Sequence, residues 1–267
     1  MSAPDSLQHI ARRWLVERRP AMEVQVLDSR GSVPREAGTR MLVAADQVAG
    51  TIGGGHLELQ AIADARAQLV AGNPAPHDRK IALGPTLGQC CGGALTLRTQ
   101  GLTSESLAAW PAETPRFTLQ LYGAGHVGRA MIKLLEGLNC KVQWIDERES
   151  EFPPEPSAAH IERMCVEPVE AEVAAAPPGC FYLVLTHSHE LDLRITEAIL
   201  KRADFGYLGL IGSQTKRARF LHRFEERGIG HEVLGRLTCP IGVPGIEGKE
   251  PEIIAIAVLA QLLQASA

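Results

Sequence analysis

The second half of the chain alternates short apolar runs with amphipathic ones. From Phe117 onward, "FTLQLYG", "KVQWID", "ERMCV", "CFYLVLT" and "YLGLIG" have the length and composition of strands. The stretches "HVGRAMIKLLEGL", "VEAEVAAAPP", "LDLRITEAILKRA", "SQTKRARFLHRFEERG" and "PEIIAIAVLAQLLQA" predict helices between and after them. Strand–helix alternation of this kind predicts a doubly wound parallel sheet.

The first half lacks that rhythm. "PDSLQHIARRWLVERR" and "LELQAIADARAQLVAG" predict helices, whereas "MEVQVLDSRGS" and "LTLR" predict strands. "TRMLVAADQVAGTI" predicts a hairpin that turns near residues 45–47. The stretch "GLTSESLAAWPAETPRF" has no periodicity and predicts a linker. We therefore expect an α/β protein with an N-terminal α+β domain over residues 1–112. A Rossmann-like doubly wound parallel-sheet domain should follow over residues 113–267.

Composition and charge exclude several classes of protein. A net charge of -4 and a pI of about 6.2 argue against a nucleic-acid-binding surface. The start has no apolar core of a signal peptide, and the longest apolar run, "IIAIAVLAQLL", is far shorter than the roughly 20 residues of a membrane span. We expect a cytoplasmic protein with no membrane contact and reduced thiols. Cys140, Cys165 and Cys180 lie in or beside apolar runs, and the sequence predicts that they are small buried hydrophobes.

A glycine fingerprint follows the first strand of the second half. In "LYGAGHVGRA", Gly123, Gly125 and Gly128 have the Gly-x-Gly-x-x-Gly spacing between a predicted strand and a predicted helix. The free N–H groups at such a helix start bind the anionic phosphates of a nucleotide-like ligand. Asp146 ends the next strand and is a candidate acceptor for ribose hydroxyls. A close-packed turn that binds nothing remains the alternative.

Polar residues follow two later strands. His187 and His189 follow "CFYLVLT", and Ser213 follows "YLGLIG", so all three should face the ligand crevice of a doubly wound sheet. His-x-His is compatible with a metal site, and equally with polar edge residues beside a helix cap. The basic run that begins at Lys216 can reach a phosphate or form a solvated helix face.

Two loops of the first domain carry further candidate chemistry. In "TIGGGHLE", Gly53–Gly55 precede a predicted helix and His56, and successive glycine N–H groups form a nest for an anion or for the polar edge of a pterin. In "LGQCCGG", Cys90 and Cys91 are neighbours, with Cα atoms about 3.8 Å apart, below the usual disulfide range of about 4.4–6.8 Å. Glycine N–H groups favour the thiolate form, which binds soft metals or carries sulfur. The alternative is one buried thiol and one bystander.

Six motifs in order resemble the XdhC/CoxI family of accessory proteins for xanthine dehydrogenase and related molybdenum hydroxylases, most closely its XdhC branch. The motifs are "TIGGGHLE", "LGQCCGG", "YGAGHVGRA…WIDER", "THSHELD", "GLIGSQTKRARF" and "CPIGVPGIEGKEPEIIAIAVLAQLL". The resemblance implies a C-terminal Rossmann domain. It also implies a chaperone that binds the molybdenum cofactor, supports its sulfuration and delivers it to apo-xanthine dehydrogenase or a related molybdenum hydroxylase. A cysteine desulfurase would supply the sulfur. The chain has His56 where some relatives carry a cysteine.

These implications define the expected site. Cys90 and Cys91 would meet molybdenum or the incoming sulfur, as metal-contacting and catalytic thiols. The expected cofactor-binding residues are Gly53, Gly54, Gly55, His56, Gln89, Gly123, Gly125, His126, Gly128, Asp146, His187, His189 and Ser213. We expect a maturation factor rather than a multiple-turnover enzyme, and the oligomeric state, a homodimer included, stays open.

Two other functions stay open. The fingerprint and Asp146 suit an NAD(P)-dependent oxidoreductase, although none of the tyrosines heads a Tyr-x-x-x-Lys motif. The basic helix from Ser213 also suits a module that docks onto a partner enzyme.

Overall fold

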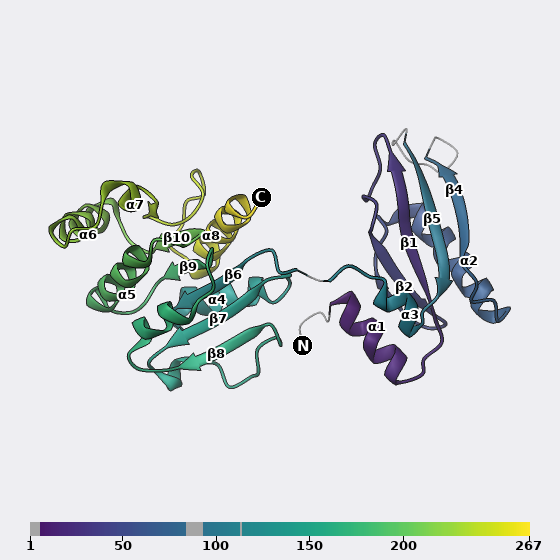
Figure 1. Cartoon of the computed structure of the whole chain (residues 1–267), viewed down its shortest axis with the longest axis horizontal. Coiled ribbons are helices and arrows are strands. Elements are labelled where there is room, and N and C mark those ends of the chain that lie inside the picture. Colours follow the sequence, from purple (N-terminus) through teal and green to yellow (C-terminus); the bar gives the residue numbers. More distant parts are fainter. Residues whose placement is uncertain (1–5, 84–92, 113) are drawn as a thin grey trace. The chain divides into compact units, whose positions relative to one another are not determined.

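The computed structural model describes residues 6–83, 93–112 and 114–267 (Figure 1). The chain divides into two units, Asp5–Ala112 and Glu113–Ala267. Each unit has its own sheet and hydrophobic core, and each is described by itself. No helix within the described ranges is both long and apolar enough to cross a lipid bilayer.

The first unit contains an antiparallel sheet with the strand order β3-β2-β1-β5-β4. Its strands are β1 (Ala21–Arg30), β2 (Arg40–Ala44), β3 (Val48–Gly50), β4 (His77–Ala82) and β5 (Ala94–Gly101). The predicted hairpin of residues 39–52 forms β2 and β3. Strand β4 was not predicted, because its sequence HDRKIA is polar and it lies exposed at the sheet edge, where no apolar alternation is needed.

Helices cover both faces of this sheet. Met41 and Val43 pack in the core that contains α2 (Gly55–Val70), whereas the alternate residues Leu42 and Ala44 pack in the core that contains α1 (Leu7–Val16). A short helix, α3 (Ser104–Ala108), begins at a capping box and lies inside the predicted linker. The linker is therefore shorter than the sequence indicated.

The second unit contains a parallel sheet with the order β11-β10-β9-β6-β7-β8. Its strands are β6 (Thr118–Tyr122), β7 (Lys141–Asp146), β8 (Ile161–Cys165), β9 (Phe181–Val184), β10 (Tyr207–Leu210) and β11 (Leu237–Thr238). This is the strand order of a Rossmann fold, and the parallel neighbours β6 and β9 mark the point at which the order of the strands reverses. The predicted α+β and Rossmann-like classes are both confirmed.

Helices cover both faces of the parallel sheet as well. One face packs against α4 (His126–Leu135) and α8 (Pro251–Ala265). The other packs against α5 (His189–Arg202), α6 (Gln214–Glu226) and the short α7 (His231–Gly235). The segment Val169–Ala175, predicted as an α-helix, is a 3-10 helix, and a second 3-10 turn spans Glu149–Glu151. In the first of these segments, the prolines at both ends leave too little length for stable α-helical turns.

Candidate functional site

The glycine turn after β6 is held in place by close packing. Gly123 has a φ of 117°, and a Cβ there would lie 2.4 Å from the carbonyl oxygen of Leu185. A Cβ on Gly128 would lie 2.1 Å from the carbonyl oxygen of Gly123. Both distances are shorter than any real Cβ contact, so the fold itself requires glycine at these two positions.

Gly125 differs from its two neighbours in the fingerprint. Its φ is -69°, which any residue adopts, and a Cβ would meet nothing within 4 Å. It is the N-cap of α4 and provides no side-chain cap, although Ser, Thr, Asp or Asn would stabilise the helix better. The N–H groups of His126 and the next residues lack intrahelical partners and carry the positive end of the helix dipole. The position therefore suits the close approach of an anion to the backbone.

Asp146 is close to the turn, but its carboxylate is already engaged. It is 4% exposed, and it accepts hydrogen bonds from the N–H of Ala124 at 2.7 Å and from the N–H of Arg148 at 2.9 Å. The Arg148 guanidinium donates to both carboxylate oxygens at 3.0 Å. Burial on its own raises the pKa of Asp146, but these bonds outweigh it and hold the pKa below its ordinary value. Four donors fill the acceptor sites of the carboxylate, so Asp146 has no lone pair left for a ribose hydroxyl while Arg148 is in place.

The polar residues after β9 and β10 do come together. His187, His189 and Ser213 line one cavity of about 270 Å³ at the carboxyl ends of these strands. Nε2 of His187 lies 3.8 Å from a carboxylate oxygen of Glu147. Ser213 accepts from the N–H of Lys216 at 3.2 Å as the N-cap of α6, so its hydroxyl has a structural role.

A buried ion pair forms the inner wall of this cavity. Nζ of Lys216 donates to Asp192 at 2.5 Å and to the Ile211 carbonyl at 2.8 Å, and the two side chains are 9% and 1% exposed. Asp192 also accepts from the N–H and the hydroxyl of Thr186, at 3.0 and 2.7 Å. A Cβ on Gly212 would lie 2.6 Å from Cδ of Lys216, so this glycine makes room for the lysine stem. The sequence placed Lys216 near the crevice but gave no signal that it pairs with Asp192.

The described cysteines do not form a reactive site. Cys140 and Cys180 are buried as predicted, and burial raises the pKa of each thiol to about 11, which keeps it protonated. The prediction for Cys165 was wrong, because it is exposed at the last position of the edge strand β8. No group of three or more His, Cys, Asp or Glu side chains within the described ranges could hold a metal ion. Gln89, Cys90 and Cys91 lie outside the described residues.

The glycine loop before α2 holds a carboxylate of the chain itself. Gly53, Gly54 and Gly55 all have positive φ values, of 121°, 74° and 66°. The same oxygen of Glu58 accepts from the N–H of Ile52 at 2.9 Å, from the N–H of Gly54 at 3.0 Å and from the hydroxyl of Thr51. Glu58 thus occupies part of the nest that was predicted to hold an external anion. Only the first N–H groups of α2 remain available to such an anion.

His56 lies exposed on the first turn of α2, with Nε2 at 2.8 Å from Nε2 of Gln60. The ring is therefore exposed to solvent at the start of the helix, and its polar contact is with the side chain of Gln60.

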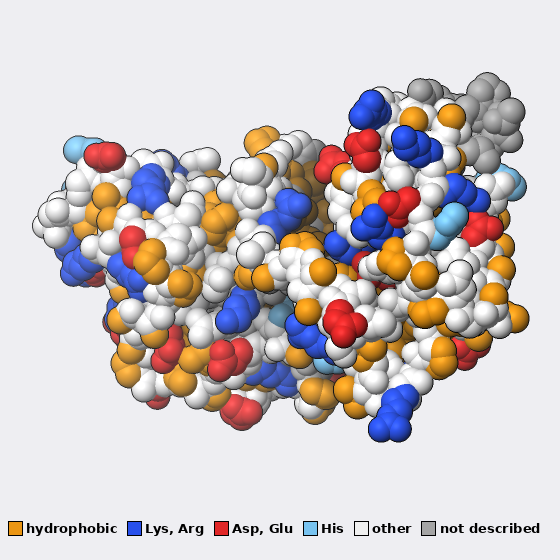
Figure 2. Space-filling model, turned by 45° about the vertical axis from the view of Figure 1, so that its right-hand side comes forward, with side chains coloured by type: hydrophobic (Ala, Val, Ile, Leu, Met, Phe, Trp, Pro, Cys, Tyr) orange, Lys and Arg blue, Asp and Glu red, His pale blue; other side chains and the backbone are white. Residues whose placement is uncertain are grey.

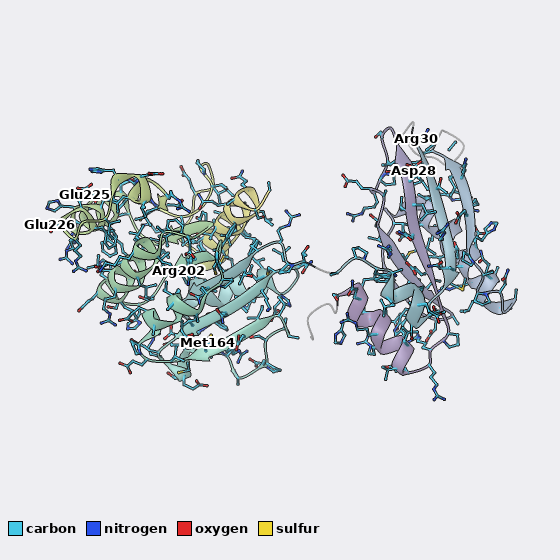
Figure 3. The ribbon with its side chains drawn as sticks, in the orientation of Figure 1. Asp28, Arg30, Met164, Arg202, Glu225 and Glu226 are labelled. Atoms are coloured by element: carbon cyan, nitrogen blue, oxygen red, sulfur yellow. The ribbon has the colours of Figure 1, made fainter. Side chains whose placement is uncertain are left out.

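Described residues on either side of the segment 84–92 lie near the loop that follows β1. The N–H of Leu83 donates to the Gly93 carbonyl at 2.8 Å. A Cβ on Gly93 would lie 2.5 Å from the carbonyl oxygens of Arg30 and Ser32, and Arg30 marks the end of β1 in Figure 3. A Cβ on Gly53 would lie 2.5 Å from Cβ of Pro34 in the same loop. The glycine loop and Gly93 therefore contact one common loop.

We expect Glu58→Gln to weaken the first unit at neutral pH by about 1.5–3 kcal/mol, the net worth of hydrogen bonds to a charged group. Burial on its own raises the pKa of Glu58, but the bonds from Thr51 and the loop N–H groups outweigh it and lower the pKa from 4.5. A lowered pKa contributes stability above the unfolded value, and this contribution is lost as the pH falls through the folded value.

Urea unfolding of the first unit between pH 3 and pH 7 measures the contribution of the Glu58 carboxylate to the free energy of unfolding. The wild type should lose more stability than Glu58→Gln as the pH falls below about 4.5. The control is Glu36→Gln, which changes an exposed carboxylate outside the loop and should leave the profile unchanged. Parallel profiles for the wild type and Glu58→Gln would contradict the expectation.

Comparison with known proteins places the chain in a defined family. The family described as the XdhC Rossmann domain matches residues 119–262, and the family described as XdhC and CoxI matches residues 14–79. The chain therefore belongs to the XdhC and CoxI family, as its motifs predicted.

A curated relative and a solved structure are similar to the chain. The uncharacterized protein YqeB of Escherichia coli (strain K12) is 34% identical over 258 residues, which cover 92% of this chain and 43% of YqeB. The chain thus spans less than half the length of that relative. The crystal structure of a protein described as a xanthine dehydrogenase from Bacillus halodurans has a TM-score of 0.76 at 18% identity, and it covers 99% of this chain and 96% of its own. At that identity the likeness shows the fold.

Proposed function

We propose that the chain is an accessory protein that binds the molybdenum cofactor and supports maturation of xanthine dehydrogenase or a related molybdenum hydroxylase. The observation that carries this proposal is the presence of both family modules in one chain, over residues 14–79 and 119–262. The name of the Bacillus halodurans protein, with the same fold over 99% of this chain, supports the choice of recipient. A cysteine desulfurase would be the second partner, as the source of sulfur.

The residues of the crevice suit the anionic part of such a cofactor. When bound, the cofactor would supply a molybdenum centre for the recipient enzyme. The N–H groups at the start of α4, around His126, would hold its phosphate, because they have no intrahelical partners and Gly125 leaves the approach open. In the first unit the free N–H groups at the start of α2 offer a second anion site beside His56. Cys90 and Cys91 are the proposed soft ligands, on the basis of the sequence alone.

The runner-up function, an NAD(P)-dependent oxidoreductase, is less well supported by the side chains. Asp146 offers no free acceptor to a ribose because Arg148 fills its carboxylate. The tyrosines Tyr122, Tyr182 and Tyr207 are 0%, 1% and 8% exposed, and burial raises the pKa of all three. They are therefore poor candidates for the acid–base group of a dehydrogenase.

Cofactor co-purification tests the proposal directly. The protein is purified from cells that make the molybdenum cofactor, and bound molybdenum and the fluorescence of the oxidised pterin are measured. We expect both signals to exceed those of an unrelated protein that is purified in the same way. Signals equal to that background would refute cofactor binding. Micromolar NADH or NADPH binding together with hydride transfer would favour the runner-up.

We expect the double substitution Cys90→Ala/Cys91→Ala to lower activation of apo-xanthine dehydrogenase by about ten-fold or more, since loss of even an outer partner of a metal ligand has that effect. Each single variant shows which thiol acts. Cys165→Ala removes an exposed thiol elsewhere and should leave activation unchanged. Full activation by the double variant would exclude both thiols from the function.

A further inference from the structure

A groove of about 610 Å³ runs between α5 and α6. Its floor is apolar, because Leu193 and Phe220 lie there with 4% and 6% of their surfaces exposed. The wall from α6 consists of one stripe of basic residues with a spacing of three or four, namely Lys216, Arg219, Arg223 and Arg227. Such a stripe lies on a single helix face. The groove therefore has one basic wall along almost the whole of α6.

Positive charge is concentrated at this groove in an otherwise acidic chain. Five of its ten lining residues are Lys or Arg and two are Glu, whereas the whole chain has a net charge of -4. Figure 2 shows Lys and Arg side chains beside apolar ones over the end of the Rossmann unit that carries α6. The acidic residues Glu225 and Glu226 follow only at the last turn of α6 (Figure 3).

Two of these cations have no partner among the described residues. Arg194 pairs with Glu170 at 3.0 Å, and Arg227 pairs with Glu197. Within the part of the chain that the structure describes, the exposed side chains of Arg219 and Arg223 make no hydrogen bond or ion pair. Like charges one helical turn apart repel each other, so this arrangement costs stability unless an anionic group approaches from outside.

The spacing favours an elongated partner over a small anion. Arg219 and Arg223 are four residues apart, about 6 Å along the helix, and the basic stripe from Lys216 to Arg227 extends over about 16 Å. The guanidinium groups therefore follow the helix axis and do not converge on one point. Carboxylates on one face of a helix repeat at the same interval, and apolar residues between them would meet Leu193 and Phe220.

We infer that the α5–α6 groove is a docking site for an acidic, amphipathic helix of a partner protein. Arg219 and Arg223 pair with its carboxylates, and the apolar floor contacts its hydrophobic side. The groove shares His189 and Lys216 with the crevice cavity, so a partner held there lies next to that cavity. The docking itself requires no cofactor, and its test is independent of the proposed function.

The probe is a capped amphipathic helical peptide with a glutamate at every fourth position, leucines three or four residues apart along the adjoining face, and alanine elsewhere. Binding to the full chain is measured by calorimetry, and hydrogen exchange locates the peptide. We expect protection of α5 and α6 and weaker binding as the salt rises from about 0.1 M to about 1 M, where the Debye length falls from about 10 Å to about 3 Å. Arg219→Glu/Arg223→Glu should weaken binding by about ten-fold or more, because each reversal replaces an attraction with a repulsion.

The matched control is Lys133→Glu/Lys141→Glu, which makes the same change of charge at two exposed positions of the same unit outside the groove. It should bind the peptide like the wild type, and a peptide with glutamine in place of glutamate should bind neither protein. Equal affinity of Arg219→Glu/Arg223→Glu and the wild type would overturn the inference. Tighter binding of inorganic pyrophosphate than of the peptide, lost in the same variant, would also overturn it in favour of a small-anion site.

Discussion

Replacement of Asp192 by alanine should lower the free energy of unfolding of the Rossmann unit by about 3–5 kcal/mol, the cost of leaving one member of a buried ion pair without its partner. Lys216 is 9% exposed, and it would lose the carboxylate at 2.5 Å. The N–H of Thr186 would lose its acceptor at the same time, and the Thr186 hydroxyl would keep only the Ser188 carbonyl. Both effects act at the carboxyl ends of β9 and β10. The residues that line the crevice should therefore become less ordered as the unit loses stability.

Hydrogen exchange can assign the loss to one unit of the two. Peptides from β9 and β10 should exchange faster in Asp192→Ala, whereas peptides from β1 and β5 should keep the wild-type rate. The double variant Asp192→Leu/Lys216→Met should lose less than the sum of its single changes, with a coupling of about 0.5–3 kcal/mol. Asp78→Asn breaks an exposed, solvent-screened pair with Arg98 and should leave the stability close to that of the wild type. A similarly small change of stability in Asp192→Ala would contradict the role given to the ion pair.

The elements of the Rossmann unit could be predicted because its strands and helices have separate sequence signals. Strand β7 (Lys141–Asp146) and helix α8 (Pro251–Ala265) have the bounds that their apolar patterns predicted. Proline at the first turn of α8 marks its start. The first unit was harder, because β4 is a polar edge strand whose place depends on pairing with β5.

The partners of the charged side chains could not be predicted in the same way. Sequence spacing placed Asp146 at the end of a strand and Glu58 at the start of a helix, and both positions are correct. What each carboxylate binds depends on atoms that the fold brings close, such as the Arg148 guanidinium or the N–H groups of the glycine loop. An acidic residue next to a nest of N–H groups is itself the signal that the nest can be filled from within the chain.

The three glycines of the fingerprint provide a test that separates folding from binding. Gly128→Ala places a methyl group 2.1 Å from the Gly123 carbonyl oxygen, which backbone on both sides fixes in position. We expect this variant to lose about 3 kcal/mol of stability, the upper end of the usual cost of overpacking. The close packing alone accounts for glycine at this position.

Gly125→Ala should instead keep the stability of the wild type within about 0.5 kcal/mol, since a slightly poorer N-cap is offset by the smaller entropy of the unfolded chain. Its Cβ meets no atom of the protein within 4 Å and can obstruct only a ligand at the start of α4. The variant should therefore unfold in urea like the wild type, yet retain clearly less molybdenum and pterin when it is purified from cofactor-producing cells. If a normally folded Gly125→Ala variant retained as much molybdenum and pterin as the wild type, the cofactor would not bind at this helix start. The glycine loop of the first unit and the cavity lined by His187, His189 and Ser213 would then be the remaining candidates among the described residues.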